Sequence, residues 1–452
     1  MAGVTFKLER YIGRISLSEA VLHEFVHAIE STGSWWLTIS FLIFIGWTTG
    51  LATKAFKVYI VLTFAAVLSM LFSSFLTPAL SRYLSDRLFL SHYKDVCDNL
   101  CGTVIVGTLS SFSFSLVLAL FFSDLPLNHK IIFASLTSAL TGVWITNNVM
   151  SILEEEKTAF FSFVIGFLLG FLFVIILGRR KLNVFLTGLT ISFAFVFFAQ
   201  LAFILKGYNR GEIIPRFSFL RIKDYFYETF SFVLFIIGIW IDKVVFWFMP
   251  GTTYKIDSLF RYSEYDLPFF VSFTIFSISQ FLIFRSFKDS IRRPYRNFIN
   301  SVHYNLPLFR ISQEKYNIIS GYRKILYSII YIYGGITTIV LFAISGGIVN
   351  LPWRNPFVFH YLIIGSFFLA IFSFNYMMLQ YLDQYRALAQ ICFIFTLING
   401  IGTYIGIKAG SEYNGLAFLF ASFISGCLSV GLVNKVLGRW EYEIFKEASK
   451  VF

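Results

Sequence analysis

Two neighbouring charges, Asp242 and Lys243, interrupt the apolar and aromatic stretch GIWIDKVVFWF at 238–248. Inside a membrane helix each charge costs roughly 2.5–3.5 kcal/mol on insertion scales, so lipid-facing positions rarely carry one. Adjacent helical residues point about 100° apart, so the two side chains do not face each other. We therefore expect one or both to face a polar or watery cavity, with a structural pair to another helix as the alternative.

Aromatic and amide side chains extend this candidate site. Trp240 and Trp247 flank the charge pair, and aromatic rings beside polar groups suit sugars, although tryptophan also anchors membrane interfaces. The other apolar stretches contribute amides, including Asn147 and Asn148, but no second charge at comparable depth. We predict that these four residues line a substrate path, with Asp242 and Lys243 as its transport or coupling residues.

A second motif, YDLPFF at 265–270, follows seventeen residues after the WIDKVVFWF stretch. Asp266 can cap a helix, and Pro268 fits the first turn of one, so plain helix capping is the simplest interpretation. Because the motif lies at the predicted outer end of a span, the two residues are also outer-gate candidates.

Residues 23–27, HEFVH, match the H-E-x-x-H pattern that holds zinc in metallopeptidases. The surrounding residues instead alternate as an amphipathic helix, with His23, His27 and Glu30 on its polar side. We interpret 1–30 as a helix on the cytoplasmic face and expect no metal site, no cofactor and no catalytic residue. No P-loop motif for ATP is present, and the short predicted outer loops leave no room for a catalytic domain.

The composition predicts a membrane protein. Of 452 residues, 57% are hydrophobic, 20% are aromatic and only 14% are charged, with a mean hydropathy of +0.72. Soluble proteins carry nearer a quarter charged residues. The net charge of +12 is explained by basic residues on the cytoplasmic side of a membrane, so nucleic acid is not an expected partner. The charged N-terminal stretch lacks the features of a cleavable signal peptide.

Stretches of about 20 apolar residues predict an all-α polytopic protein of twelve transmembrane helices in two six-helix bundles around a central cavity. The distribution of lysine and arginine favours cytoplasmic N- and C-termini, although 178–183 is a basic outer loop. The expected bundles are 31–205 and 228–452, joined by a cytoplasmic connector at 206–227. The predicted spans are 31–50, 58–80, 100–122, 131–153, 160–177, 184–205, 228–249, 267–284, 325–349, 357–381, 388–407 and 414–436.

A basic cytoplasmic insert, 285–324, interrupts the second bundle. We interpret it as a helical hairpin on the membrane surface that faces anionic lipid. Docking of a cytosolic partner is the alternative. Its basic residues are Arg285, Lys288, Arg292, Arg293, Arg296, Arg310, Lys315, Arg323 and Lys324.

Several stretches together resemble the PelG family, the membrane transporters of the Pel exopolysaccharide apparatus. They are MAGVTFKL (1–8), SRYLSDRLF (81–89), GIWIDKVVFWF (238–248), YDLPFF (265–270), YLDQYRAL (381–388) and WEYEIF (440–445). The chain departs from the family pattern at 31–38, which lacks a proline before the tryptophan, and HEFVH is not part of that pattern. The resemblance implies the fold of the multidrug/oligosaccharide-lipid/polysaccharide exporter superfamily, in the cytoplasmic (inner) membrane.

The resemblance also implies export of an amino-sugar-rich polymer, with a cytosolic Pel glycosyltransferase and membrane-bound Pel subunits as partners. A scaffold subunit of the synthase complex and a lipid-linked oligosaccharide flippase remain alternatives. Since a carboxylate suits amino sugars better than an ammonium does, we expect loss of Asp242 to harm export more than loss of Lys243.

Overall fold

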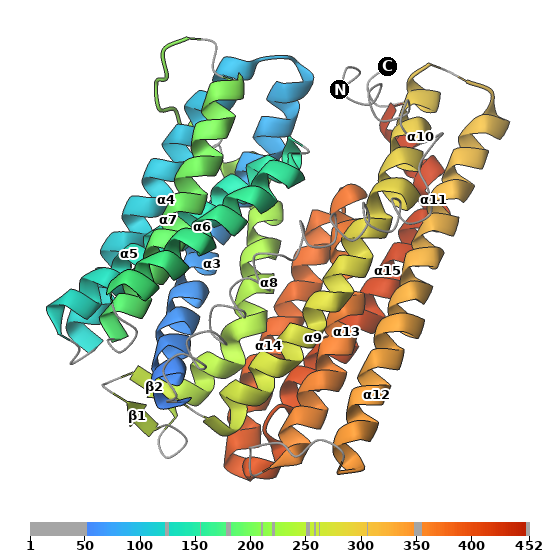
Figure 1. The fold of residues 1–452 in the computed structure, drawn as a ribbon. Coiled ribbons are helices and arrows are strands. Elements are labelled where there is room, and N and C mark those ends of the chain that lie inside the picture. The colour runs from blue at the N-terminus through green and yellow to red at the C-terminus, as the bar shows by residue number, and fades with distance from the viewer. Residues whose placement is uncertain are drawn as a thin grey trace, which may run out of the picture. The chain divides into compact units, whose positions relative to one another are not determined.

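The computed structural model describes residues 52–122, 126–153, 155–177, 182–208, 211–218, 222–249, 254–256, 259–261, 263–304, 306–347 and 355–448. Long helices dominate these residues, with one two-stranded antiparallel hairpin among them (Figure 1). Nine of the described helical segments are long and apolar enough to cross a membrane. The prediction of a helical, multi-pass membrane protein is therefore confirmed by the length and composition of these helices.

The predicted number of spans is met only in part. The first predicted span, 31–50, lies outside the described residues. Helices α5 (Leu127–Ile152) and α9 (Ser263–Phe287) occupy two further predicted spans, but neither is among the nine apolar candidates within the described part of the chain. Twelve spans in two six-helix bundles therefore stay a prediction.

The chain divides into two compact units, and the division falls inside α8 (Ile222–Phe248), between Ile236 and Ile237. Unit 1 comprises the residues up to Ile236 together with the hairpin region Tyr254–Arg261. Unit 2 comprises Ile237–Thr253 and everything from Tyr262 onward. Asp242 and Lys243 therefore belong to unit 2.

Unit 1 is organised around α5, which packs against α3 (Ala52–Phe89), α4 (Tyr93–Phe122) and α7 (Leu182–Tyr208). Helix α6 (Glu156–Leu177) packs mainly against α7. Strands β1 (Tyr254–Ile256) and β2 (Leu259–Arg261) pair antiparallel, with Tyr254 opposite Arg261.

Polar side chains inside unit 1 are hydrogen-bonded between helices. Gln200 of α7 is fully buried, accepts a hydrogen bond from Thr146 of α5 at 2.8 Å and donates to Ser162 of α6 at 3.1 Å. Each bond satisfies a group that would otherwise be costly in an apolar interior. These amide and hydroxyl contacts thus fix how the helices pack.

The predicted connector is held against α4. The backbone N–H of Ile214 donates to Asp98 Oδ1 at 3.0 Å, and that of Ser218 donates to Asn99 Oδ1 at 2.8 Å. The guanidinium of Arg216 lies 3.5 Å from Asp98 Oδ2. Gly102 makes the approach possible, because a Cβ there would collide with the carbonyl oxygen of Arg216. Two buried side chains on α4 thus order a segment that the sequence presents only as a basic linker.

Unit 2 contains two long helical runs joined at one end (Figure 1). In the first, α9 continues through a π-helical turn, η3 (Lys288–Arg292), into α10 (Arg293–His303). In the second, α11 (Leu308–Ser328) continues through η4 (Ile329–Tyr333) into α12 (Gly334–Ser345). The basic insert therefore forms the ends of these two runs.

The remaining helices of unit 2 are α13 (Pro356–Tyr381), α14 (Tyr385–Ala409), the short 3₁₀ helix η5 (Ser411–Tyr413) and α15 (Leu416–Ala448). Helix α15 packs against α13 and α14, while α13 also packs against α9. Asn355 caps α13 through a hydrogen bond from the N–H of Phe357, 3.1 Å long, and Pro356 follows as its first residue.

Candidate functional site

Asp242 and Lys243 are both buried in α8, with relative exposures of 0% and 1%. Asp242 precedes the last helical residue, Phe248, by six positions. At 1.5 Å per residue that is about 9 Å, so the pair lies toward one end of the helix and not at its centre. The insertion cost is therefore lower than for a central charge, but both groups still require partners.

Asp242 finds its partner on the next helix. The hydroxyl of Tyr265, at the start of α9, donates to Asp242 Oδ2. The backbone N–H of Lys243 donates to Asp242 Oδ1 at 2.7 Å. Tyr265 is fully buried, and its ring lies 4.3 Å from that of Phe246, so the hydroxyl is fixed in position. Both carboxylate oxygens therefore accept a hydrogen bond inside the protein.

The ammonium of Lys243 lies among aromatic rings. Its Nζ is 3.9 Å from the ring centre of Phe269 and 4.9 Å from that of Trp240. A desolvated cation over an aromatic face gains about 2 kcal/mol. Lys243 also interacts electrostatically with the carboxylates of Asp266 and Asp242. We call Asp242, Lys243, Tyr265 and Asp266 the α8–α9 charge cluster.

This arrangement corrects two expectations from the sequence. First, a second acidic group does lie near the pair, because α9 begins at Ser263 and brings Asp266 beside α8, where it is only 5% exposed. Second, neither charge of the pair faces an open cavity in this structure, since protein atoms enclose both. The cluster combines two carboxylates, one ammonium and one phenol, and can therefore hold or transfer a proton or bind a cation when opened.

A contact with α14 supports the helical turn before Asp242. The side-chain amide of Asn399 donates to the carbonyl oxygen of Gly238 at 2.8 Å. A Cβ at Gly238 would collide with the ring of Phe395 and lie 2.9 Å from Thr396 Oγ1. The absence of a side chain at Gly238 thus lets α14 approach α8 closely.

The other predicted path residues are distributed over both units. Trp240 and Trp247 are 7% and 4% exposed, so in this state they do not offer open faces to a sugar. Trp240 packs with Phe269, at 5.7 Å between ring centres. Asn148, on α5 in unit 1, donates to Ser81 Oγ at 2.5 Å, and Asn147 is partly buried beside it.

The outer-gate candidates lie inside the first two turns of α9 and do not precede the helix. Asp266 belongs to the first turn and Pro268 follows inside the helix, so Asp266 does not cap it. Pro268 is buried, and its carbonyl accepts a hydrogen bond from Ser272 Oγ at 2.8 Å. The HEFVH residues lie outside the described residues. Within the described ranges, no group of three or more His, Cys, Asp or Glu residues could hold a metal.

Sequence reasoning missed three residues of this site: Tyr265, Phe269 and Asn399. A signal existed for the first two, since YDLPFF contains both and follows GIWIDKVVFWF across a single loop, which carries β1 and β2. Two antiparallel helices joined by such a loop bring residues near the turn side by side. Asn399 gives no comparable signal, because it is one of many amides in apolar stretches.

The comparison with protein families decides the identity of the chain. The family profile PelG, described as "Putative exopolysaccharide Exporter (EPS-E)", matches residues 1–445. The chain belongs to the PelG family. No match is found among curated proteins.

Solved structures show the fold of this PelG-family member. An outward-facing multidrug resistance MATE family transporter of the MOP superfamily superposes with a TM-score of 0.62 and 10% identity, over 93% of this chain and 96% of that one. A Vibrio cholerae MATE transporter, VcmN, gives a TM-score of 0.61 and 12% identity, over 92% and 96%. A MOP superfamily transporter from Pyrococcus furiosus gives 0.57 and 11%, again over 92% and 96%. The chain therefore has a MATE-like transporter fold, and both its family and its fold are those of transporters.

Proposed function

We propose that this protein exports a nascent amino-sugar-rich exopolysaccharide of the Pel type across the cytoplasmic membrane. Family membership over residues 1–445 and the MATE-like fold support a membrane exporter. The assignment of an amino-sugar-rich polymer as substrate depends on the α8–α9 charge cluster. Buried ionisable groups in membrane helices are energetically costly and are kept for substrate or ion pathways. A cytosolic glycosyltransferase and membrane-bound subunits supply the polymer, and both termini are cytoplasmic.

Alternating access is the proposed mode of transport. Its support comes from the solved relatives, which include an outward-facing and an inward-facing conformation of a MATE family transporter. The inward-facing structure matches with a TM-score of 0.56, over 93% of this chain. A cluster that is enclosed in one conformation and open in another can bind on one side of the membrane and release on the other.

The single observation that carries the proposal is the enclosed contact between Asp242 and Tyr265, with the ammonium of Lys243 alongside. A carboxylate in this position can bind the ammonium of an amino sugar or carry a proton. In either role its charge must change partner during the cycle. The neutral amide of Asn cannot do so, although it keeps nearly the same shape.

The test is the amount of exported polymer from cells that produce the Asp242→Asn variant at matched membrane levels. We expect the variant to insert normally and to export little or no polymer. Asp289→Asn is the matched control, since Asp289 is an exposed carboxylate, 3.2 Å from Arg293, on the π-helical turn. Near-normal export by Asp242→Asn would refute the role of the cluster. Loss of export in both variants would point to a general defect.

A further inference from the structure

A buried amide on α14 contacts the turn of α8 that carries Asp242. Asn399 is fully buried, and its Nδ2 donates to the carbonyl oxygen of Gly238 at 2.8 Å. In an α-helix that carbonyl also accepts the N–H of the residue four positions further on, which is Asp242. The side chain of Asn399 is therefore linked to the backbone of Asp242 through a single carbonyl group.

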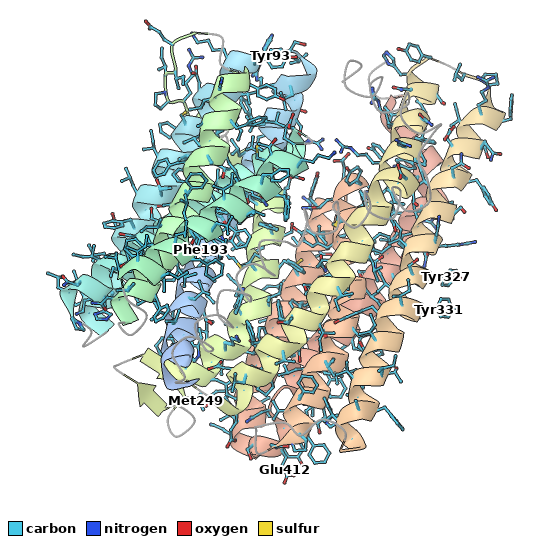
Figure 2. The ribbon with its side chains drawn as sticks, viewed as in Figure 1. Tyr93, Phe193, Met249, Tyr327, Tyr331 and Glu412 are labelled. Atoms are coloured by element: carbon cyan, nitrogen blue, oxygen red, sulfur yellow. The ribbon has the colours of Figure 1, made fainter. Side chains whose placement is uncertain are left out.

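The two helices meet at the same level of unit 2. Met249, which follows α8, and Glu412, in η5 just after α14, lie toward the same end of that unit in Figure 2. Gly238 precedes the last residue of α8 by ten positions, and Asn399 precedes the last residue of α14 by ten. At 1.5 Å per residue both lie about 15 Å from that end.

Close packing sets the position of this turn from the α14 side. A Cβ at Gly238 would collide with α14, and a Cβ at Gly400 would lie 3.2 Å from Ile241 Cγ1. On α9, the hydroxyl of Tyr265 donates to the carboxylate of Asp242. The turn is therefore held by α14 through its backbone and by α9 through its acidic side chain.

The acceptor half of the Asn399 amide is unsatisfied. Its Oδ1 is buried, and none of the residues that the structure describes donates a hydrogen bond to it. Exchanging the two amide atoms would bring Oδ1 against the carbonyl oxygen of Gly238, so the orientation is determined. An unsatisfied buried acceptor costs at least as much as one neutral hydrogen bond gains. Stability alone therefore does not account for an amide at this position.

Asn375 of α13 shows what a stabilising amide looks like in the same unit. It is also fully buried, but both halves are used. Its Nδ2 donates to the carbonyl oxygen of Ile371 at 2.8 Å, and its Oδ1 accepts from the hydroxyl of Tyr322 at 2.8 Å. Removing this amide would leave a buried tyrosine hydroxyl without its acceptor. Removing Asn399 leaves no such group, because the carbonyl of Gly238 keeps its helical N–H.

We propose that Asn399 is a positioning residue for Asp242, an inference that rests on the proposed export function. Asn399 does not touch the substrate. When an ammonium of the amino sugar replaces Tyr265 as the partner of Asp242, the turn loses its contact with α9. The hydrogen bond from α14 then keeps the turn in place, so that the carboxylate stays where the ammonium binds.

The experiment measures binding of two oligosaccharides, one of glucosamine and one of N-acetylglucosamine, to the full-length chain in lipid nanodiscs. The first carries ammonium groups and the second does not. We expect Asn399→Ala to bind the glucosamine oligomer about tenfold more weakly, within the range for residues of one hydrogen-bonded network. Its affinity for the N-acetylated oligomer should change little, so the preference for the amine falls. Asp242→Asn should lose that preference altogether.

Asn375→Ala is the matched control, since it removes an equally buried amide from the same unit. It should unfold at a lower temperature than Asn399→Ala and keep the wild-type preference for the amine. A purely structural role of Asn399 would give the opposite pattern, with a clear loss of stability and equal weakening for both oligomers. That pattern, or an unchanged preference in Asn399→Ala, would overturn the positioning role.

Asp242→Asn separates this failure from a failure of the proposed function. If Asp242→Asn loses the preference for the amine and Asn399→Ala keeps it, only the positioning role is rejected. If Asp242→Asn keeps the preference, or the wild type binds neither oligomer, the proposed role of Asp242 in export is rejected together with it.

Discussion

Replacing Tyr265 with phenylalanine removes one hydroxyl and leaves the rest of the α8–α9 charge cluster in place. That hydroxyl donates to Asp242 Oδ2 in a fully buried setting. The phenyl ring that remains can keep the contact with Phe246, 4.3 Å away between ring centres. The substitution therefore tests the hydrogen bond with little change in packing.

The expected magnitude follows from the charge of the acceptor. A hydrogen bond to a charged group contributes about 1.5–3 kcal/mol, and a buried acceptor without its donor bears the desolvation cost. Asp242 retains the N–H of Lys243 at 2.7 Å, so the loss is partial. We expect Tyr265→Phe to lower the free energy of unfolding by about 1.5–3 kcal/mol and to reduce export.

The assay is equilibrium unfolding of the purified protein in detergent, followed by circular dichroism, for Tyr265→Phe, Asp242→Asn and the double variant. Because the two side chains are in contact, their effects should differ from the sum by at least about 0.5 kcal/mol. Tyr413→Phe, at a tyrosine that is 47% exposed, serves as the control and should change little. Additive effects, or a Tyr265→Phe variant as stable as the wild type, would refute the contact.

Three further substitutions test other parts of the account. Lys243→Gln should lower the free energy of unfolding by about 3–5 kcal/mol and abolish export, because Asp242 and Asp266 then lack their buried cation. Export at the wild-type level by this variant would contradict the role proposed for the α8–α9 charge cluster. Asp98→Ala should speed tryptic cleavage after Arg216 several-fold, since the connector loses its ion pair with α4, 3.5 Å long. An unchanged cleavage rate would argue that Asp98 does not hold the connector against α4. Pro268→Ala should change stability by less than about 1 kcal/mol and leave export largely intact, whereas complete loss of export with normal folding would make this turn part of the outer gate.

The expectation for Lys243 removes the difference predicted from the sequence, where loss of Asp242 was the more harmful change. The sequence prediction ranked loss of Lys243 as the milder change, because a carboxylate suits amino sugars better than an ammonium does. In the structure it interacts with Asp266 as well as with Asp242. Removing the ammonium therefore leaves two acidic groups in a buried site, which is the costly outcome for buried ion pairs.

Much of the fold could be predicted from the sequence, because long apolar segments have few alternatives to helix in a membrane. The ends of the helices could not, since polar side chains extend helices past the apolar run. Helix α9 begins at Ser263, four residues before its predicted span, and so carries Tyr265 and Asp266 to α8. Helix α11 begins at Leu308, well before the predicted span at 325, and carries the second half of the basic insert.

The candidate site could also be predicted only in part. The cost of burial alone singled out Asp242 and Lys243, and both are buried in the structure. Their partners depend on which helix packs against α8 and on the position of each residue along the helix axis. The hydropathy of the sequence gives neither. Asn399 illustrates this, because its hydrogen bond to Gly238, 2.8 Å long, joins residues 161 positions apart.

The central claim is that this chain itself moves polymer through a path governed by Asp242. The most direct measurement is uptake of amino-sugar-rich polymer into sealed vesicles that contain the purified full-length chain and no partner protein. The account predicts uptake by the wild type and its loss in vesicles that hold the same amount of Asp242→Asn. Equal uptake by both proteins, or none by the wild type, would contradict it.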